Sequence, residues 1–110
     1  MKNDELRTEA RVAVICQGTM SVGDRTAPCV IQNMCSRGFL IRAHKELPVG
    51  ALVRLTCELY PQRRVECLVQ VRHVNRECLG AKVIEITEDG KLLCRQFIEE
   101  QRAANLRSVA

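Results

Sequence analysis

The residues best suited to bind a charged ligand fall in two short stretches of this 110-residue chain. Arg7 and Arg11 place two guanidinium groups four positions apart, directly before an apolar run. The second stretch, residues 33–38, reads Asn-Met-Cys-Ser-Arg-Gly and lies between two further apolar runs. A guanidinium fork binds phosphate with two parallel hydrogen bonds. A turn that offers backbone N–H groups, a hydroxyl and another guanidinium also suits a phosphate.

The second stretch has the composition of a turn. Asn33 suits its start, because an asparagine side chain bonds backbone groups two residues on. Gly38 suits its end, where a positive φ or the close approach of another group is required. Taken alone, residues 33–38 fit a plain hairpin turn, and Arg7 and Arg11 fit two solvated charges. Both alternatives stay open at this point.

Composition limits the classes of protein that the chain can belong to. Apolar residues make up 46% and charged residues 27%, with a net charge of +4, which is ordinary for one soluble domain. The seven cysteines form no CxxC pair, and His44 and His73 do not flank them at zinc-ligand spacing. We therefore expect reduced cysteines in a cytoplasmic protein, with no metal or other cofactor. No apolar run reaches the roughly 20 residues that span a bilayer, so no membrane insertion is expected.

Hydrophobic periodicity predicts a mainly β fold. Apolar and polar residues alternate in six segments separated by turn residues, and the period changes to that of a helix after residue 86. We expect a six-stranded antiparallel β-barrel of the split-barrel type, because closure removes exposed strand edges. One domain covers residues 1–110, with a flexible leader over 1–10, the barrel over 11–86 and a C-terminal helix over 87–107. The predicted strands are 11–16, 26–32, 38–43, 51–60, 63–74 and 78–86.

Two function classes are disfavoured by what the sequence lacks. Neither histidine stands beside a serine or cysteine at a strand end, so no nucleophile and base are proposed and an enzyme is not expected. Barrels that bind single-stranded nucleic acid stack bases on aromatic rings. The chain has one tyrosine and two phenylalanines, and Phe39 and Phe97 are expected in the core. A nucleic-acid polymer is therefore not an expected partner.

In order and spacing, these features make the chain resemble the PilZ domain, a bacterial receptor module for cyclic di-GMP. Its signatures are RxxxR before the first strand and [D/N]xSxxG after the second. Arg7 and Arg11 match the first; Asn33 and Gly38 match the second, with Cys35 where serine is expected. The later strands and the terminal helix also fit, so the resemblance covers nearly the whole chain.

The resemblance implies a non-catalytic receptor in second-messenger signalling, with cyclic di-GMP as its ligand. Arginine binds the O6 and N7 edge of guanine with two hydrogen bonds, so Arg7 and Arg11 would contact guanine or phosphate. The leader would become ordered over the nucleotide and pass the signal to a motility, adhesion or polysaccharide partner. Leu6 stands where some members have another arginine, which favours one ligand per domain. The remaining implied site residues are Asn33, Cys35, Ser36, Arg37 and Gly38.

Two alternatives to a cyclic di-GMP receptor remain. The chain can be a PilZ-like protein–protein adaptor that binds no nucleotide, which the thiol of Cys35 favours and the two arginines disfavour. A small basic nucleic-acid-binding barrel is the third reading. The downstream partner, the affinity and the oligomeric state do not follow from the sequence.

Overall fold

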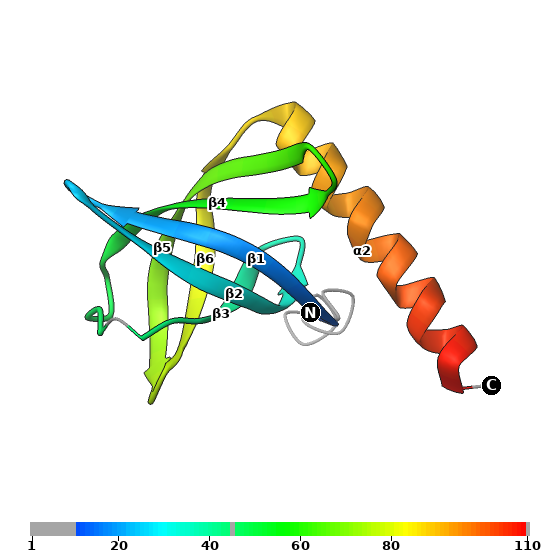
Figure 1. Cartoon of the computed structure of the whole chain (residues 1–110), viewed down its shortest axis with the longest axis horizontal. Helices are drawn as coiled ribbons and strands as arrows, with labels where there is room; N and C mark the ends of the chain where they lie inside the picture. The colour runs from blue at the N-terminus through cyan, green and yellow to red at the C-terminus, as the bar shows by residue number, and fades with distance from the viewer. Residues whose placement is uncertain (1–10, 45, 110) are drawn as a thin grey trace, which may run out of the picture.

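The structure is a computed structural model that describes residues 11–44 and 46–109. Six strands form a barrel, and one long helix follows them (Figure 1). The elements are β1 (Val12–Val22), β2 (Arg25–Cys35), β3 (Gly38–Arg42), β4 (Leu52–Tyr60), β5 (Arg63–Asn75), β6 (Cys78–Ile86) and α2 (Glu88–Val109). The predicted leader over 1–10, which carries Leu6 and Arg7, lies outside the described residues.

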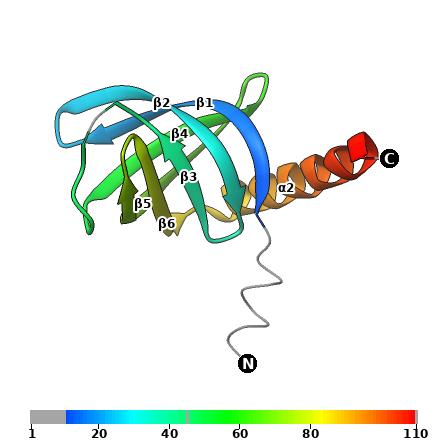
Figure 2. The same ribbon diagram turned by 90° about the horizontal axis from the view of Figure 1, so that it is seen from below.

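The strands close into an antiparallel barrel in the order β1-β2-β3-β6-β5-β4. This confirms the predicted six-stranded barrel with a C-terminal helix. Closure between β1 and β4 is short: only Gly18 to Ser21 pair with Arg54 to Cys57. Seen from below, the strands curve around a common interior while α2 lies along one side and extends past the barrel (Figure 2). The helix contacts β1 and β5.

Alternation of apolar residues fills the barrel interior. Every second residue of β1, β4 and β5 is buried over most of each strand, so these strands present one face to the core. Phe39 is 2% exposed, as predicted, and five of the seven cysteines are also buried. The buried cysteines are Cys16, Cys29, Cys57, Cys67 and Cys94.

The helix begins where the sequence changes period. The Oγ1 atom of Thr87 accepts a hydrogen bond from the backbone N–H of Gly90 at 3.0 Å, which makes Thr87 the N-cap. Glu88 and Asp89 then occupy the first turn, where negative charge suits the helix dipole. Phe97 and Ile98 are buried against the barrel. The helix continues to Val109, two residues beyond the predicted end.

The turn between β2 and β3 is shorter than predicted. β2 extends through Cys35 and β3 begins at Gly38, so only Ser36 and Arg37 form the turn. The predicted loop over 33–38 is therefore mostly strand. Asn33 is held in the sheet on both sides, opposite Ala13 of β1 and Leu40 of β3, next to an irregularity in each ladder. Pairing with two neighbours outweighs the turn preference of its side chain.

Within the part of the chain that the structure describes, no helix has both the length and the apolar character needed to cross a membrane.

Candidate functional site

A cationic groove lies on the outer surface of the barrel, where the β2–β3 turn meets β6 and β5. Its cavity measures about 330 Å³. We call it the turn groove and define it by its lining residues. These are Arg11, Cys35, Arg37, Gly38, Arg72, His73, Gly80, Ala81 and Lys82.

Strand order creates this groove from segments far apart in the sequence. β3 pairs with β6, which places Gly38 opposite Lys82. β6 pairs in turn with β5, which places Gly80 opposite His73. The backbone N–H of Val83 donates to the carbonyl of Arg37 at 2.8 Å and so fixes the turn against β6. The groove is thus bounded by strand ladders on rigid elements.

Two glycines allow close packing in the groove wall. A Cβ atom on Gly38 would lie 2.3 Å from the carbonyl oxygen of Ala81, which no real Cβ tolerates. The backbone of Gly38 does not have a positive φ, so the close approach of β6 is the reason for glycine here. A Cβ on Gly80 would lie 2.9 Å from Cδ2 of His73, which places the imidazole directly over Gly80.

Arg11 of the RxxxR stretch contacts the second stretch, residues 33–38. Its Nη1 donates to Oδ1 of Asn33 at 3.5 Å, a long hydrogen bond between exposed groups 22 residues apart. The contact follows from the β1–β2 pairing, in which Ala13 faces Asn33. The structure therefore brings Arg11 beside the second motif. Arg7, the other predicted arginine, lies outside the described residues.

Cys35 and Ser36 lie on the helix side of the turn. They line a second hollow of about 230 Å³, which is also lined by Phe39 and by Lys91 and Arg95 of α2. Ser36 lines only this hollow, whereas Cys35 lines both. Of the predicted residues described, Cys35, Arg37 and Gly38 thus share the turn groove with Arg11. Asn33 reaches it through Arg11, and Ser36 faces the helix.

Positive charge dominates the turn groove. Arg11, Arg37, Arg72 and Lys82 line it, and no described lining residue is acidic. The guanidinium of Arg72 donates through Nη1 to Oε1 of Gln70 at 3.1 Å, which steadies its outward orientation. Such a cluster attracts anions, and the arginines supply planar forks for phosphate or guanine.

Sequence reasoning missed Arg72, His73 and Lys82 as site residues. Arg72 follows the buried Val71 on β5, and Lys82 follows the buried Ala81 on β6, so alternation alone puts both outside the barrel. No sequence signal places these outer positions beside the β2–β3 turn, because β3 is followed along the chain by β4 but pairs with β6.

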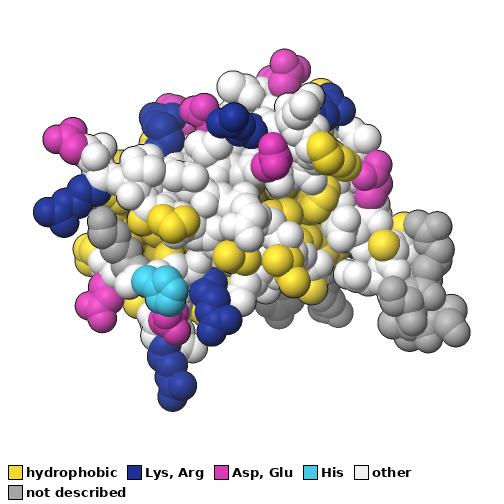
Figure 3. All heavy atoms as spheres, in the orientation of Figure 1, with side chains coloured by type: hydrophobic (Ala, Val, Ile, Leu, Met, Phe, Trp, Pro, Cys, Tyr) yellow, Lys and Arg dark blue, Asp and Glu magenta, His cyan; other side chains and the backbone are white. Residues whose placement is uncertain are grey.

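A larger hollow lies elsewhere, between the start of β5 and α2, with a volume of about 770 Å³. It contains none of the predicted residues. Acidic and basic side chains both line it, so its charge does not favour an anion. Figure 3 shows hydrophobic and oppositely charged side chains next to one another over the first turns of α2. For a phosphate ligand the smaller turn groove is the better candidate.

The buried cysteines are packing residues and not nucleophiles. Burial raises the pKa of the Cys29 and Cys94 thiols to about 11 and that of Cys67 to about 12. Such thiols stay neutral at physiological pH, while thiolate is the reactive form. All seven cysteines are free.

Comparisons with known proteins agree with this architecture. The family model of the PilZ domain matches residues 5–100. No curated protein was found to match the chain. A solved structure, that of the Bacillus subtilis inhibitor of motility (MotI/DgrA), is similar with a TM-score of 0.76 and 15% sequence identity. The match covers 86% of this chain and 49% of that one, so the chain spans about half the length of this relative. At this identity the likeness establishes the fold.

Proposed function

The chain belongs to the PilZ domain family, whose members are generally non-catalytic receptors for cyclic di-GMP, and we propose that it binds this dinucleotide in the turn groove. The observation that carries the proposal is the contact of Arg11 with Asn33 beside a groove lined by Arg37, Arg72 and Lys82. A residue of each family signature therefore lies at one cationic surface.

The chemistry of the groove suits this ligand. Cyclic di-GMP carries two phosphates and two guanines, so it offers both anionic oxygens and planar acceptor edges. Arginine forks bind either one bidentately, and the guanidinium face also stacks on a purine. In the proposal Arg7 and Arg11 contact guanine or phosphate, and Asn33 orients Arg11 through the hydrogen bond to its guanidinium.

The turn supplies the remaining contacts in the proposal. Arg37 contributes a cation from the turn, and Gly38 lets the β3 backbone approach β6 so that the groove floor is formed. Cys35 takes the place of the family serine and presents a weak hydrogen-bonding thiol. Ser36 acts from the helix side of the turn. Arg72 and Lys82 extend the cationic wall beyond the two family motifs.

We further propose how binding is read out. The segment that carries Arg7 closes over the nucleotide and presents a new surface to a downstream protein of a motility, adhesion or polysaccharide system. The protein works in the cytoplasm, where bacterial second messengers are made. One ligand binds per domain, because Leu6 stands where an additional arginine would support a stacked pair.

The aromatic rings disfavour a nucleic-acid polymer as the partner. Phe39 and Phe97 are buried, and Tyr60 packs edge-on against Phe97 with ring centroids 5.4 Å apart. Phe39 and Phe97 therefore offer no free face for base stacking, and Tyr60 alone does not make the series of aromatic rings on which successive bases stack.

Calorimetric titration with cyclic di-GMP tests the proposal. We expect saturable binding by the parent chain and a loss of about 10- to 150-fold in affinity for Arg7→Ala or Arg11→Ala, the effect of removing a charge-assisted hydrogen bond. The matched control is Arg25→Ala, an exposed arginine at the other end of the β1–β2 hairpin, which should bind like the parent.

Two outcomes would overturn the proposal. Absence of binding by the folded parent would leave the adaptor function, which the thiol at Cys35 favours. Parent-like binding by both arginine variants would show that these side chains are solvated charges and that the ligand binds elsewhere.

A further inference from the structure

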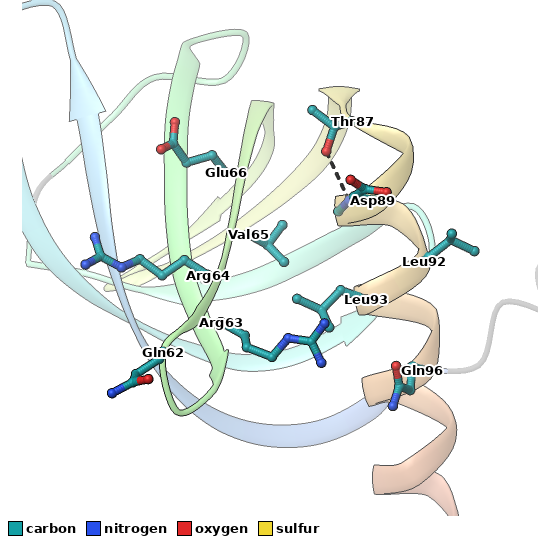
Figure 4. A pocket seen from close by; sticks show the side chains of 11 residues that line it. Gln62, Arg63, Arg64, Val65, Glu66, Thr87, Asp89, Leu92, Leu93 and Gln96 are labelled. Carbon is teal, nitrogen blue, oxygen red and sulfur yellow. Dashed lines mark hydrogen bonds between the residues drawn. The ribbon is translucent and has the colours of Figure 1, made fainter.

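A hollow larger than the turn groove is not used by the proposed ligand site. It runs between the start of β5 and the first turns of α2, and we call it the β5–α2 groove. Its volume of about 770 Å³ exceeds that of the turn groove. Figure 4 shows Arg63 extending across it from the strand toward the helix, with Val65 and Leu93 also lining the hollow.

A projecting leucine borders this hollow. Leu92 lies on α2 and is 57% exposed, so much of this large apolar side chain is open to solvent. Val65 is almost fully buried and Leu93 is half-buried, so the floor of the groove is apolar. One surface thus carries both an apolar projection and an apolar depression.

The two ends of the groove carry opposite charges. Asp89 lies at one end beside Thr87, whereas the guanidinium of Arg63 lies at the other end near Gln96 (Figure 4). Residues 89 and 96 are about 10 Å apart along the helix axis at 1.5 Å per residue. No residue of ranges 11–44 and 46–109 forms an ion pair with Arg63 or Asp89. Leu92 lies between these charges along the helix.

We propose that the β5–α2 groove is the interface of a homodimer. In a two-fold arrangement the same patch faces itself, so every contact occurs twice. With the two helices antiparallel, Arg63 of each copy meets Asp89 of the other. Leu92 of each copy then fills the groove of its neighbour. A self-complementary interface requires matching features on one patch. This patch has an apolar projection, an apolar depression and two opposite charges.

The alternatives fit the groove less well. In the lining of the groove, Asp89 and Glu66 offset Arg63 and Arg64, so it lacks the excess of positive charge that would favour the phosphates of a nucleotide. A peptide of another protein would need an apolar side chain between a negative and a positive charge at the same spacing. A second copy of this chain already presents that arrangement. The inference does not depend on cyclic di-GMP, and its test uses the chain without ligand.

The experiment combines sedimentation with a charge exchange. We expect the parent to show a mass that rises toward the dimer at chain concentrations up to about 1 mM. Arg63→Asp and Asp89→Arg, measured separately, should each raise the dimer dissociation constant about tenfold or more, because both contacts become repulsive. Leu92→Lys, at an exposed position that cannot disturb the core, should abolish association.

Mixing the two charge variants gives the decisive readout. In a mixed pair, the carboxylate introduced at position 63 of one chain faces the guanidinium introduced at position 89 of the other. The second contact joins the unchanged Asp89 of the first chain to the unchanged Arg63 of the second, so both contacts are attractive again. Native mass spectrometry should therefore show mixed dimers in excess over either homodimer. The matched control, Arg25→Asp, changes charge equally at an exposed site outside the groove and should associate like the parent.

Three results would overturn the inference. They are a parent that stays monomeric over the whole concentration range, a Leu92→Lys variant that dimerises like the parent, or charge variants that mix without preference. Circular dichroism of each variant checks that the barrel is folded. If a charge variant does not fold, the Leu92→Lys variant still tests the interface.

Discussion

Among single residues, Gly38 and Cys35 shape the β2–β3 turn for different reasons. Gly38 is fixed by packing, since any side chain there would meet the carbonyl of Ala81. Cys35 is fixed by neither packing nor chain geometry: it is half-buried and lines both hollows beside the turn. A hydroxyl at Cys35 would fit the same space and bond more strongly than a thiol.

Replacing Cys35 by serine should strengthen the proposed site. A neutral hydrogen bond contributes about 1 kcal/mol net, so Cys35→Ser should bind cyclic di-GMP roughly five-fold more tightly in calorimetry under reducing conditions. Cys78→Ser is the matched control, because Cys78 is also half-buried but lines no part of the turn groove. Weaker binding by Cys35→Ser would mean that the thiol packs against the ligand or the helix in a way that a hydroxyl cannot.

Among the elements, α2 is attached to the barrel by the last residue of β4. Tyr60 packs its ring against Phe97 at an interplanar angle of 89° and donates its hydroxyl to Oε1 of Glu100 at 2.5 Å. Burial and the carboxylate of Glu100 raise the pKa of Tyr60 to about 12. Together with the burial of Phe97 and Ile98, this attachment holds α2 against the barrel.

Removing the hydroxyl of Tyr60 should weaken the attachment of α2 without unfolding the barrel. Tyr60→Phe keeps the ring contact and loses the hydrogen bond, so the free energy of unfolding should fall by about 1 kcal/mol, the typical net contribution of one intramolecular hydrogen bond. Urea denaturation followed by circular dichroism measures this. Glu100→Gln in the same background should add little if the two groups act as a pair. Full additivity of the two changes would show that Tyr60 and Glu100 stabilise the fold separately.

For the molecule as a whole, the core contains five buried cysteine thiols. Burial raises the pKa of five cysteines above the ordinary value of 9.0, most strongly at Cys57. Below about pH 9 both the folded and the unfolded chain keep these protons, and stability is complete. Above it the unfolded chain ionises first and is favoured, until the folded thiols of Cys29, Cys94 and Cys67 also titrate near pH 11–12.

The barrel should therefore lose stability in alkali. Each buried thiol contributes a slope of up to about 1.4 kcal/mol per pH unit above pH 9, so five together can exhaust a typical domain stability within a few pH units. Denaturant midpoints from pH 7 to 11 under reducing conditions measure the effect. Cys67→Ala removes one thiol and should flatten the slope, although it lowers stability at pH 7. An unchanged slope would show that the thiols stay protonated in both states.

Local patterns in the chain were enough to predict six strands, the inward faces of β4 and β5 and the helix start, whereas β1 continues to Val22, six residues beyond its predicted end. These depend on neighbouring residues only: alternation along β4 and β5, and the cap at Thr87 with acidic residues after it. The two signature stretches were also visible, because each is short and continuous. Their ordering along the chain was enough to indicate the family.

Only the tertiary structure shows which strands pair with one another. The β3–β6 pairing, between strands separated by β4 and β5 in the sequence, brings Arg72 and Lys82 to Gly38. Pairing on both sides also extended β2 through Asn33 and Cys35, against the turn preference of Asn33. Backbone hydrogen bonds between strands form in the same way for almost every residue type. Alternation along a strand therefore predicts which face of the sheet a residue occupies, but not which strand pairs beside it. The contact of Tyr60 with α2 and the β5–α2 groove follow from the same long-range packing.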